Sequence, residues 1–210
     1  MTRLAGLLDR ALVAVRAISR FLARAAGLVL VAAVAMIVTE VLVRRLFAAS
    51  LLPSFELSGY VLALCMSWSL AFALFEKAHI RIDVIYMRAG HRIRTVLDIL
   101  ALAMLAVFCV YLARAGIDVA SSSLSRGSLA NTPLQTPLWI PQALWAVGLA
   151  WFLVATVLLL ARAVVAAISE PREAVQRIAG SPTLDEQIAA ELAEAEEGAT
   201  DDAAGREGTR

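Results

Sequence analysis

The stretch Glu76-Lys77-Ala78-His79-Ile80-Arg81-Ile82-Asp83 places four charged side chains and one histidine between two long apolar segments. The segment before it, residues 55–75, has no basic residue and a single acid near its start. After a short basic stretch, residues 96–113 are again almost wholly apolar. Charge this dense in so apolar a chain predicts that the polypeptide leaves a membrane here and turns back into it.

The composition points in the same direction. The chain has 210 residues, of which 60% are hydrophobic, and a mean hydropathy of +0.77. Soluble domains contain roughly 45–50% apolar residues, so the excess indicates a membrane protein. The net charge of +1 gives no indication of nucleic-acid binding. Cys65 and Cys109 both lie in apolar runs, which favours buried thiols over a disulfide or a metal site.

Four segments are long and apolar enough to span a bilayer, which takes about 20 residues of helix. These predicted spans are residues 25–43, 55–75, 96–113 and 143–165. Leucine and alanine dominate them and strict alternation is missing, which favours helices over strands. We therefore predict an all-α integral membrane protein with four transmembrane helices, its membrane domain covering residues 25–168.

The basic residues predict the orientation of these spans. Arginine and lysine gather before the first span, between the second and third, and after the fourth. The opposite side carries only Arg44, Arg45, Arg114 and Arg126. Both termini and the 76–94 loop are therefore predicted to be cytoplasmic, an N-in, C-in arrangement. The long arginine-bearing segment before the first span argues against a cleaved signal peptide, so we expect that span to remain as an anchor.

The two ends of the chain have their own character. Residues 1–24 predict a separate basic amphipathic helix on the cytoplasmic face, suited to the membrane surface or to docking on a partner subunit. Its apolar face would carry Leu4, Leu8, Ala11, Val15, Ile18 and Leu22. Residues 169–210 predict an acidic cytoplasmic tail that is partly disordered.

The connection between the third and fourth spans is the longest stretch predicted to be non-helical. Residues 121–128 are rich in serine and are expected to be flexible. Residues 131–141 contain three prolines, which oppose a continuous helix. Trp139 and Trp145 lie where an interfacial aromatic belt is expected.

Acidic residues within the spans are the first candidates for function, because ionisable groups in lipid are costly. Glu40 precedes Arg44 by four residues, which predicts an ion pair on one helix face. Glu56 opens the second span, where helix N–H groups favour an acid. Across a short hairpin it could also meet Arg44 or Arg45. These residues are predicted to serve the structure or a partner interface.

Two further groups of ionisable residues were considered. Asp98 and Asp118 lie at opposite ends of the third span, so neither is expected to be buried. His79 is the candidate whose protonation could change near physiological pH. Because acids and bases flank it, we predict that His79 anchors its loop rather than relaying protons.

Motifs of catalysis and of cofactor binding are absent from the sequence. Both histidines lie in one loop, so no span offers an axial haem ligand. The sequence has no H-E-x-x-H, G-x-S-x-G, Walker-type loop or C-x-x-C. The spans also lack the paired polar or glycine-rich segments from which transporters build their sites. We expect neither an enzyme nor a metal or cofactor site, and no transport by this chain alone.

An ordered set of short motifs nevertheless resembles a known family. Val43–Phe47 closes the first span, Phe55–Leu57 opens the second, Trp68 lies mid-span, and Glu76–Asp83 and Thr136–Pro141 follow. Over about residues 25–165 this order resembles the small, DctQ-like membrane subunit of tripartite ATP-independent periplasmic (TRAP) transporters. The residues predicted to hold the structure or meet a partner are Glu40, Arg44, Arg45, Glu56, Trp68, His79, Arg81, Asp83, Trp139 and Pro141.

The resemblance implies a multi-pass protein of the bacterial inner membrane that scaffolds a large TRAP permease. That permease would hold the sodium and substrate sites, and a periplasmic binding protein would deliver an organic acid such as a dicarboxylate or a sialic acid. The small subunit would brace the static part of the permease during elevator-like movement and help dock the binding protein. Membrane lipid is the remaining expected partner.

Two departures from the family pattern stand out. The family often has a glycine soon after the mid-span tryptophan, where this chain reads Ser69-Leu70-Ala71, so close helix packing is less expected there. The acidic tail is also longer than usual. An alternative interpretation stays open, namely a structural or assembly anchor of another membrane complex, such as a respiratory one.

Overall fold

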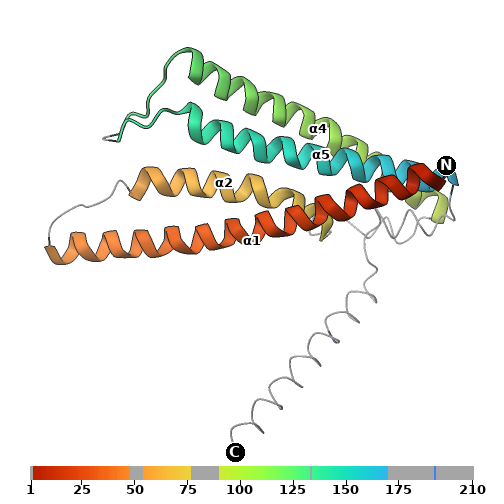
Figure 1. Ribbon diagram of the computed structural model, residues 1–210, viewed down its shortest axis with the longest axis horizontal. Helices are drawn as coiled ribbons and strands as arrows, with labels where there is room; N and C mark the ends of the chain where they lie inside the picture. The colour runs from red at the N-terminus through yellow and green to blue at the C-terminus, as the bar shows by residue number, and fades with distance from the viewer. Residues whose placement is uncertain (1, 48–53, 77–89, 133, 170–191, 193–210) are drawn as a thin grey trace, which may run out of the picture. The chain divides into compact units, whose positions relative to one another are not determined.

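The computed structural model describes residues 2–47, 54–76, 90–132, 134–169 and 192 of the chain. The chain forms two compact units, Met1–Ala179 and Gly180–Arg210. The first unit holds four helices, α1 (Thr2–Phe47), α2 (Ser54–Phe75), α4 (His91–Ser125) and α5 (Trp139–Ser169) (Figure 1). In the second unit the described residue is Leu192, which is helical and exposed.

All four helices are long and apolar enough to cross a membrane, which confirms the predicted all-α, four-span fold. Helix α2 differs from the predicted span 55–75 by one residue at its start. Helices α4 and α5 both extend beyond the predicted spans 96–113 and 143–165. Hydropathy marks the part of a helix that lies in lipid, whereas the helix itself continues until the backbone meets a stop signal.

Helix α1 has no break at Arg24, so the expected boundary between a surface helix and the first span is not a helix boundary. The junction reads Arg24-Ala25-Ala26-Gly27-Leu28, without proline and rich in alanine, the strongest helix former. The lone Gly27 does not interrupt it. At 1.5 Å per residue α1 is about 69 Å long, roughly twice the thickness of a bilayer core.

The end of α4 also corrects the sequence analysis, because residues 121–125 are helical rather than part of a flexible loop. Gly127, with φ of 62°, ends the helix in a left-handed conformation that suits glycine. The N–H of Ser128 donates to the carbonyl of Ser123 at 3.0 Å, and that of Gly127 to Leu124 at 3.2 Å. This pair of bonds is a Schellman motif.

The remaining connection, residues 128–138, folds back on itself as a narrow hairpin, which we call the 128–138 hairpin. The N–H of Ala130 donates to the carbonyl of Thr136 at 2.9 Å. Gln135 makes the turn with a positive φ of 49°. Pro141 lies in the first turn of α5, where its missing N–H would have had no partner in the helix. The third proline therefore does not prevent the helix.

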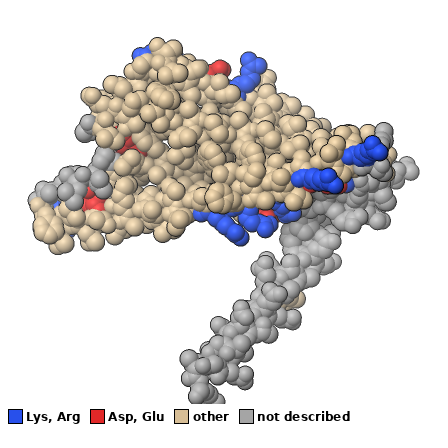
Figure 2. All heavy atoms as spheres, viewed as in Figure 1, with Lys and Arg blue, Asp and Glu red and all other residues tan. Residues whose placement is uncertain are grey.

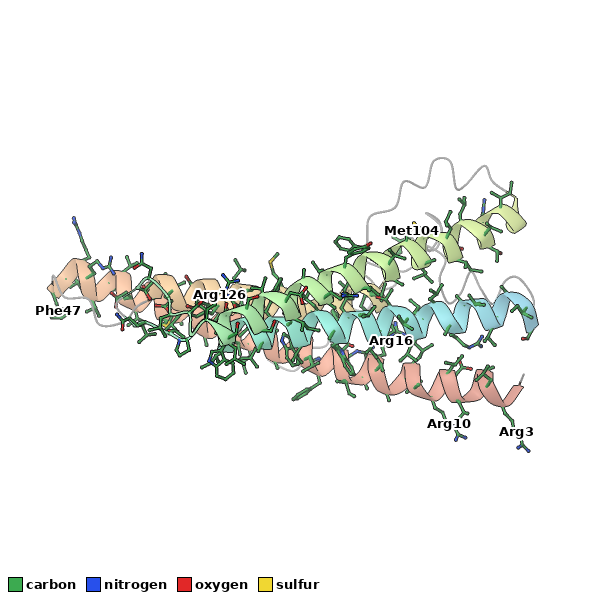
Figure 3. All side chains as sticks on the ribbon, turned by 90° about the horizontal axis from the view of Figure 1, so that it is seen from above. Arg3, Arg10, Arg16, Phe47, Met104 and Arg126 are labelled. Carbon is green, nitrogen blue, oxygen red and sulfur yellow. The ribbon has the colours of Figure 1, made fainter. Side chains whose placement is uncertain are left out.

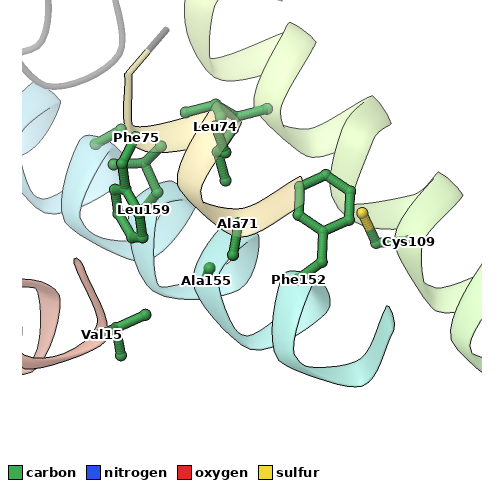
Figure 4. Close-up of a cluster of buried hydrophobic side chains, with 10 residues drawn as sticks. Val15, Ala71, Leu74, Phe75, Cys109, Phe152, Ala155 and Leu159 are labelled. Carbon is green, nitrogen blue, oxygen red and sulfur yellow. The ribbon is translucent and has the colours of Figure 1, made fainter. Parts of the chain in front are cut away.

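Helix α5 is the centre of the bundle, because it packs against α1, α2 and α4. Helices α1 and α2 form one antiparallel pair, and α4 and α5 form the other (Figure 1). Small residues of α5, including Ala155 and Ala163, are fully buried and let neighbouring backbones approach. Figure 4 shows Phe152 and Leu159 of α5 packed among side chains of the other helices, in the largest apolar cluster of the bundle.

Helix α2 ends well before α5 does. Ser67 of α2 lies level with Gly148 of α5, and from there α5 runs about 20 Å further than α2. Residues 2–24 of α1, which we call the arm, take the place of α2 along this last part of α5. Val15 of the arm belongs to the same buried cluster as Phe75.

Candidate functional site

Trp68 joins α2 to α5 at the middle of the bundle. Its indole Nε1 donates to the carbonyl of Leu144 at 3.0 Å. A methyl group at Gly148 would lie 2.6 Å from Ser67 Oγ and 2.8 Å from Trp68 Cδ1. Ala71 is fully buried in the same contact. Contrary to the expectation drawn from Ser69-Leu70-Ala71, the two helices therefore pack as closely as backbone atoms allow, with the glycine on α5.

The two cysteines are buried and free, which confirms their interpretation as buried thiols. The thiol of Cys65 donates to the carbonyl of Ala26 at 3.1 Å and so connects α2 with α1. The Cys109 sulfur lies 3.8 Å from the Thr156 hydroxyl, between α4 and α5. Each thiol marks a contact between two helices.

Glu56 joins the start of α2 to the 128–138 hairpin. Its carboxylate is buried and accepts a hydrogen bond from the Tyr60 hydroxyl at 2.8 Å and another from the Thr132 hydroxyl. The expected partners were Arg44 or Arg45, but the described contacts are with hydroxyl groups. Thr132 lies 76 residues along the chain, so sequence spacing carries no signal for this contact.

Glu40 and Arg44 form the predicted ion pair on α1. Arg44 Nη2 donates to Glu40 Oε1 at 3.0 Å. The Glu40 side chain is 1% exposed, whereas the Arg44 side chain is 63% exposed. Arg44 therefore neutralises a buried carboxylate while keeping most of its own length in contact with the surroundings. Arg45 is exposed beside it.

The arm is held to α5 by two contacts that the sequence analysis missed. Arg162 Nε of α5 donates to Asp9 Oδ1 at 2.6 Å, and Arg162 is 7% exposed. The indole of Trp151 donates to the hydroxyl of Ser19 at 3.0 Å, and Ser19 is fully buried. One face of the arm is therefore part of the bundle.

The arm also meets the end of α2, where the charged run that follows the second span begins. Arg16 Nη2 donates to the carbonyl of Phe75 at 3.2 Å, a favourable place for a cation because carbonyls point outward at a helix C-terminus. Arg16 and Arg20 lie 3.7 and 3.8 Å from Glu76 Oε1. These side chains are about half exposed, so the contacts position the helices more than they stabilise them.

Three predicted residues, His79, Arg81 and Asp83, lie outside the described residues. Trp139 begins α5 and is 39% exposed. Asp98 was expected to be exposed but is 1% exposed.

The burial of Asp98 follows from its place on α4. It shares a face with Leu102, Cys109 and Ala113, all buried at the spacing of a helix face that packs on α5. Asp118 is exposed, as predicted, and lines a polar hollow with Ser122 and Arg126 at the end of α4.

The described residues hold helices together and shape binding surfaces. Within the part of the chain that the structure describes, no group of three His, Cys, Asp or Glu residues could hold a metal ion. An apolar groove of about 240 Å³ runs between α1, α2 and the start of α5, lined by residues that include Cys65 and Trp68. This arrangement suits contact with apolar partners rather than a reaction.

Comparison with known proteins gives one match. The family described as "Tripartite ATP-independent periplasmic transporters, DctQ component" matches residues 33–166. The matched segment is more than half of the chain and contains the Glu56 and Trp68 contacts as well as Arg162, but not the arm. No curated protein and no solved structure matches the chain.

Proposed function

Because this chain belongs to the DctQ family, the small membrane component of the tripartite ATP-independent periplasmic transporters, we propose that it scaffolds a large permease subunit. The permease carries out sodium-coupled uptake of an organic acid, and a periplasmic binding protein delivers that acid. The chain lies in the bacterial inner membrane with both termini in the cytoplasm.

The observation that supports a scaffold is the fixing of the bundle at three levels. Arg162 holds the arm at one end, Trp68 joins α2 to α5 in the middle, and Glu56 holds the 128–138 hairpin at the other end. A subunit that braces a moving partner needs this rigidity. A transporter that moved its own substrate would instead need helices free to change their contacts.

Exposed apolar faces supply the area for the partner. Of the span regions of α1 and α4, 11% and 22% are buried inside the bundle. Val31 and Leu28 of α1 and Phe108 and Tyr111 of α4 are more than half exposed. Helices of the large permease and lipid chains cover these faces in the membrane.

The 128–138 hairpin and the polar hollow of Asp118, Ser122 and Arg126 then face the periplasm. Their hydroxyl groups and charges suit the polar rim of a transient protein interface. We assign the docking of the binding protein to this surface.

Co-expression with a tagged large permease tests the proposal. The chain should co-purify with the permease, and uptake of the organic acid should require both membrane subunits and the binding protein. As a control, the tagged permease expressed without this chain should reach the membrane but support no uptake. Uptake by this chain alone would refute the scaffold.

A further inference from the structure

The arm has a second face that the bundle does not use. Asp9, Val15 and Ser19 face the rest of the bundle. The opposite side leaves large apolar side chains exposed, with exposed fractions of 53% for Leu4, 63% for Leu7, 70% for Val13 and 69% for Phe21. An apolar surface of this kind on a helix that continues into a membrane span needs a cover.

Arginines border this exposed face. Arg3 and Arg10 are seven residues apart, which places them on the same side of the helix. Figure 3 shows both side chains directed away from α4 and α5, and Figure 2 shows basic side chains along the same part of α1. Arg16 and Arg20 contact Glu76, whereas the structure pairs neither Arg3 nor Arg10 with a described carboxylate.

Exposed apolar side chains bordered by arginines are the pattern of a helix that lies in a membrane interface. Guanidinium groups bind phosphate oxygens through two parallel hydrogen bonds, and each basic residue near an anionic surface strengthens binding. We propose that the outward face of the arm binds anionic phospholipids of the surrounding bilayer, with Arg3 and Arg10 at the headgroups and Leu7 and Phe21 toward the acyl chains.

This inference goes beyond the scaffold function and does not depend on it. The arm precedes residue 33, where the family match begins. It also changes the meaning of the arm, since one face is fixed to the protein and the other to lipid. A lipid belt held at this end would fix the tilt of a helix about 69 Å long.

The experiment uses the isolated full chain in nanodiscs, with a fluorophore on Leu7→Cys and the two native cysteines replaced by alanine. Quenching by brominated phosphatidylglycerol is compared with quenching by brominated phosphatidylcholine, which gives the relative binding constant of the two lipids at the arm. We expect a preference for phosphatidylglycerol of roughly fivefold for each arginine. Raising the salt concentration should weaken it.

The double variant Arg3→Gln/Arg10→Gln should lose this preference, whereas Arg3→Lys/Arg10→Lys should keep most of it. The matched control, Arg114→Gln/Arg126→Gln, removes the same charge from exposed positions on α4 and should change nothing. Equal quenching by the two lipids, or an equal loss in the control, would overturn the proposal. A label that neither lipid quenches, and that only the large permease protects, would assign the face to a protein instead.

Discussion

Replacing Gly148 by alanine is the sharpest test of the contact between α2 and α5. The added methyl group would lie 2.6 Å from Ser67 Oγ and 2.8 Å from Trp68 Cδ1, so the helices must move apart. Overpacking of this kind costs about 1–3 kcal/mol. Separation also weakens the bond from Trp68 to Leu144, and interhelical hydrogen bonds in membranes contribute about 0.6 kcal/mol on average.

Helix propensity works in the opposite direction, because alanine is favoured over glycine by about 1 kcal/mol. Gly59→Ala on α2 is the matched control, since a methyl group there has no atom within 4 Å and shares the propensity gain. We therefore expect Gly148→Ala to be about 2–3 kcal/mol less stable than Gly59→Ala. The measurement is unfolding by sodium dodecyl sulfate in mixed micelles, followed by circular dichroism.

A second variant separates the clash from other effects. Ser67→Ala removes the Oγ atom nearest to the new methyl group, so the double variant should recover part of the loss. Gly116→Ala should have a smaller effect than Gly148→Ala, since its nearest contacts would be 3.3 Å away. Equal stability of Gly148→Ala and Gly59→Ala would refute the close contact.

Three further predictions concern the ends of the bundle. Glu56→Ala frees the 128–138 hairpin and should impair assembly with the large permease more than membrane insertion; blue-native gels that show intact complex but lost uptake would contradict this. Asp9→Ala leaves the buried Arg162 without this carboxylate and should lower the free energy of unfolding by about 1 kcal/mol, since the Asp9 side chain is 54% exposed; Asp118→Ala is the control, and equal losses in the two variants would argue against the ion pair. His79→Cys should resist a membrane-impermeant thiol reagent in intact cells, where the two native cysteines are buried; labelling there would overturn the topology.

The spans were predictable because lipid imposes one rule on every residue of a crossing helix, and the four apolar segments follow it. The helix ends were less so, since α4 continues through residues 121–125 after its apolar segment stops. Gly127 was a usable signal there, as a glycine just after a helix commonly ends it. For α1, the absence of proline near Arg24 already favoured a continuous helix.

Side-chain partners were predictable only where they are local. Glu40 and Arg44 lie one turn apart on the same helix, so spacing alone predicted their contact. Glu56 meets a residue 76 positions away, and Arg162 meets one 153 positions away. Such contacts depend on which helices are neighbours. The burial of Asp98 was missed for the same reason, because only the packing of α4 on α5 decides which face is covered.

The ion pair between Asp9 and Arg162 has a consequence for how this family diversifies. Arg162 lies within the segment that matches the family, whereas Asp9 lies before it. A relative that lacked the arm would leave a guanidinium at this position facing apolar surroundings without that carboxylate. Such a relative is therefore expected to carry an uncharged side chain there. The arginine and the arm should be gained and lost together, as a single heritable unit.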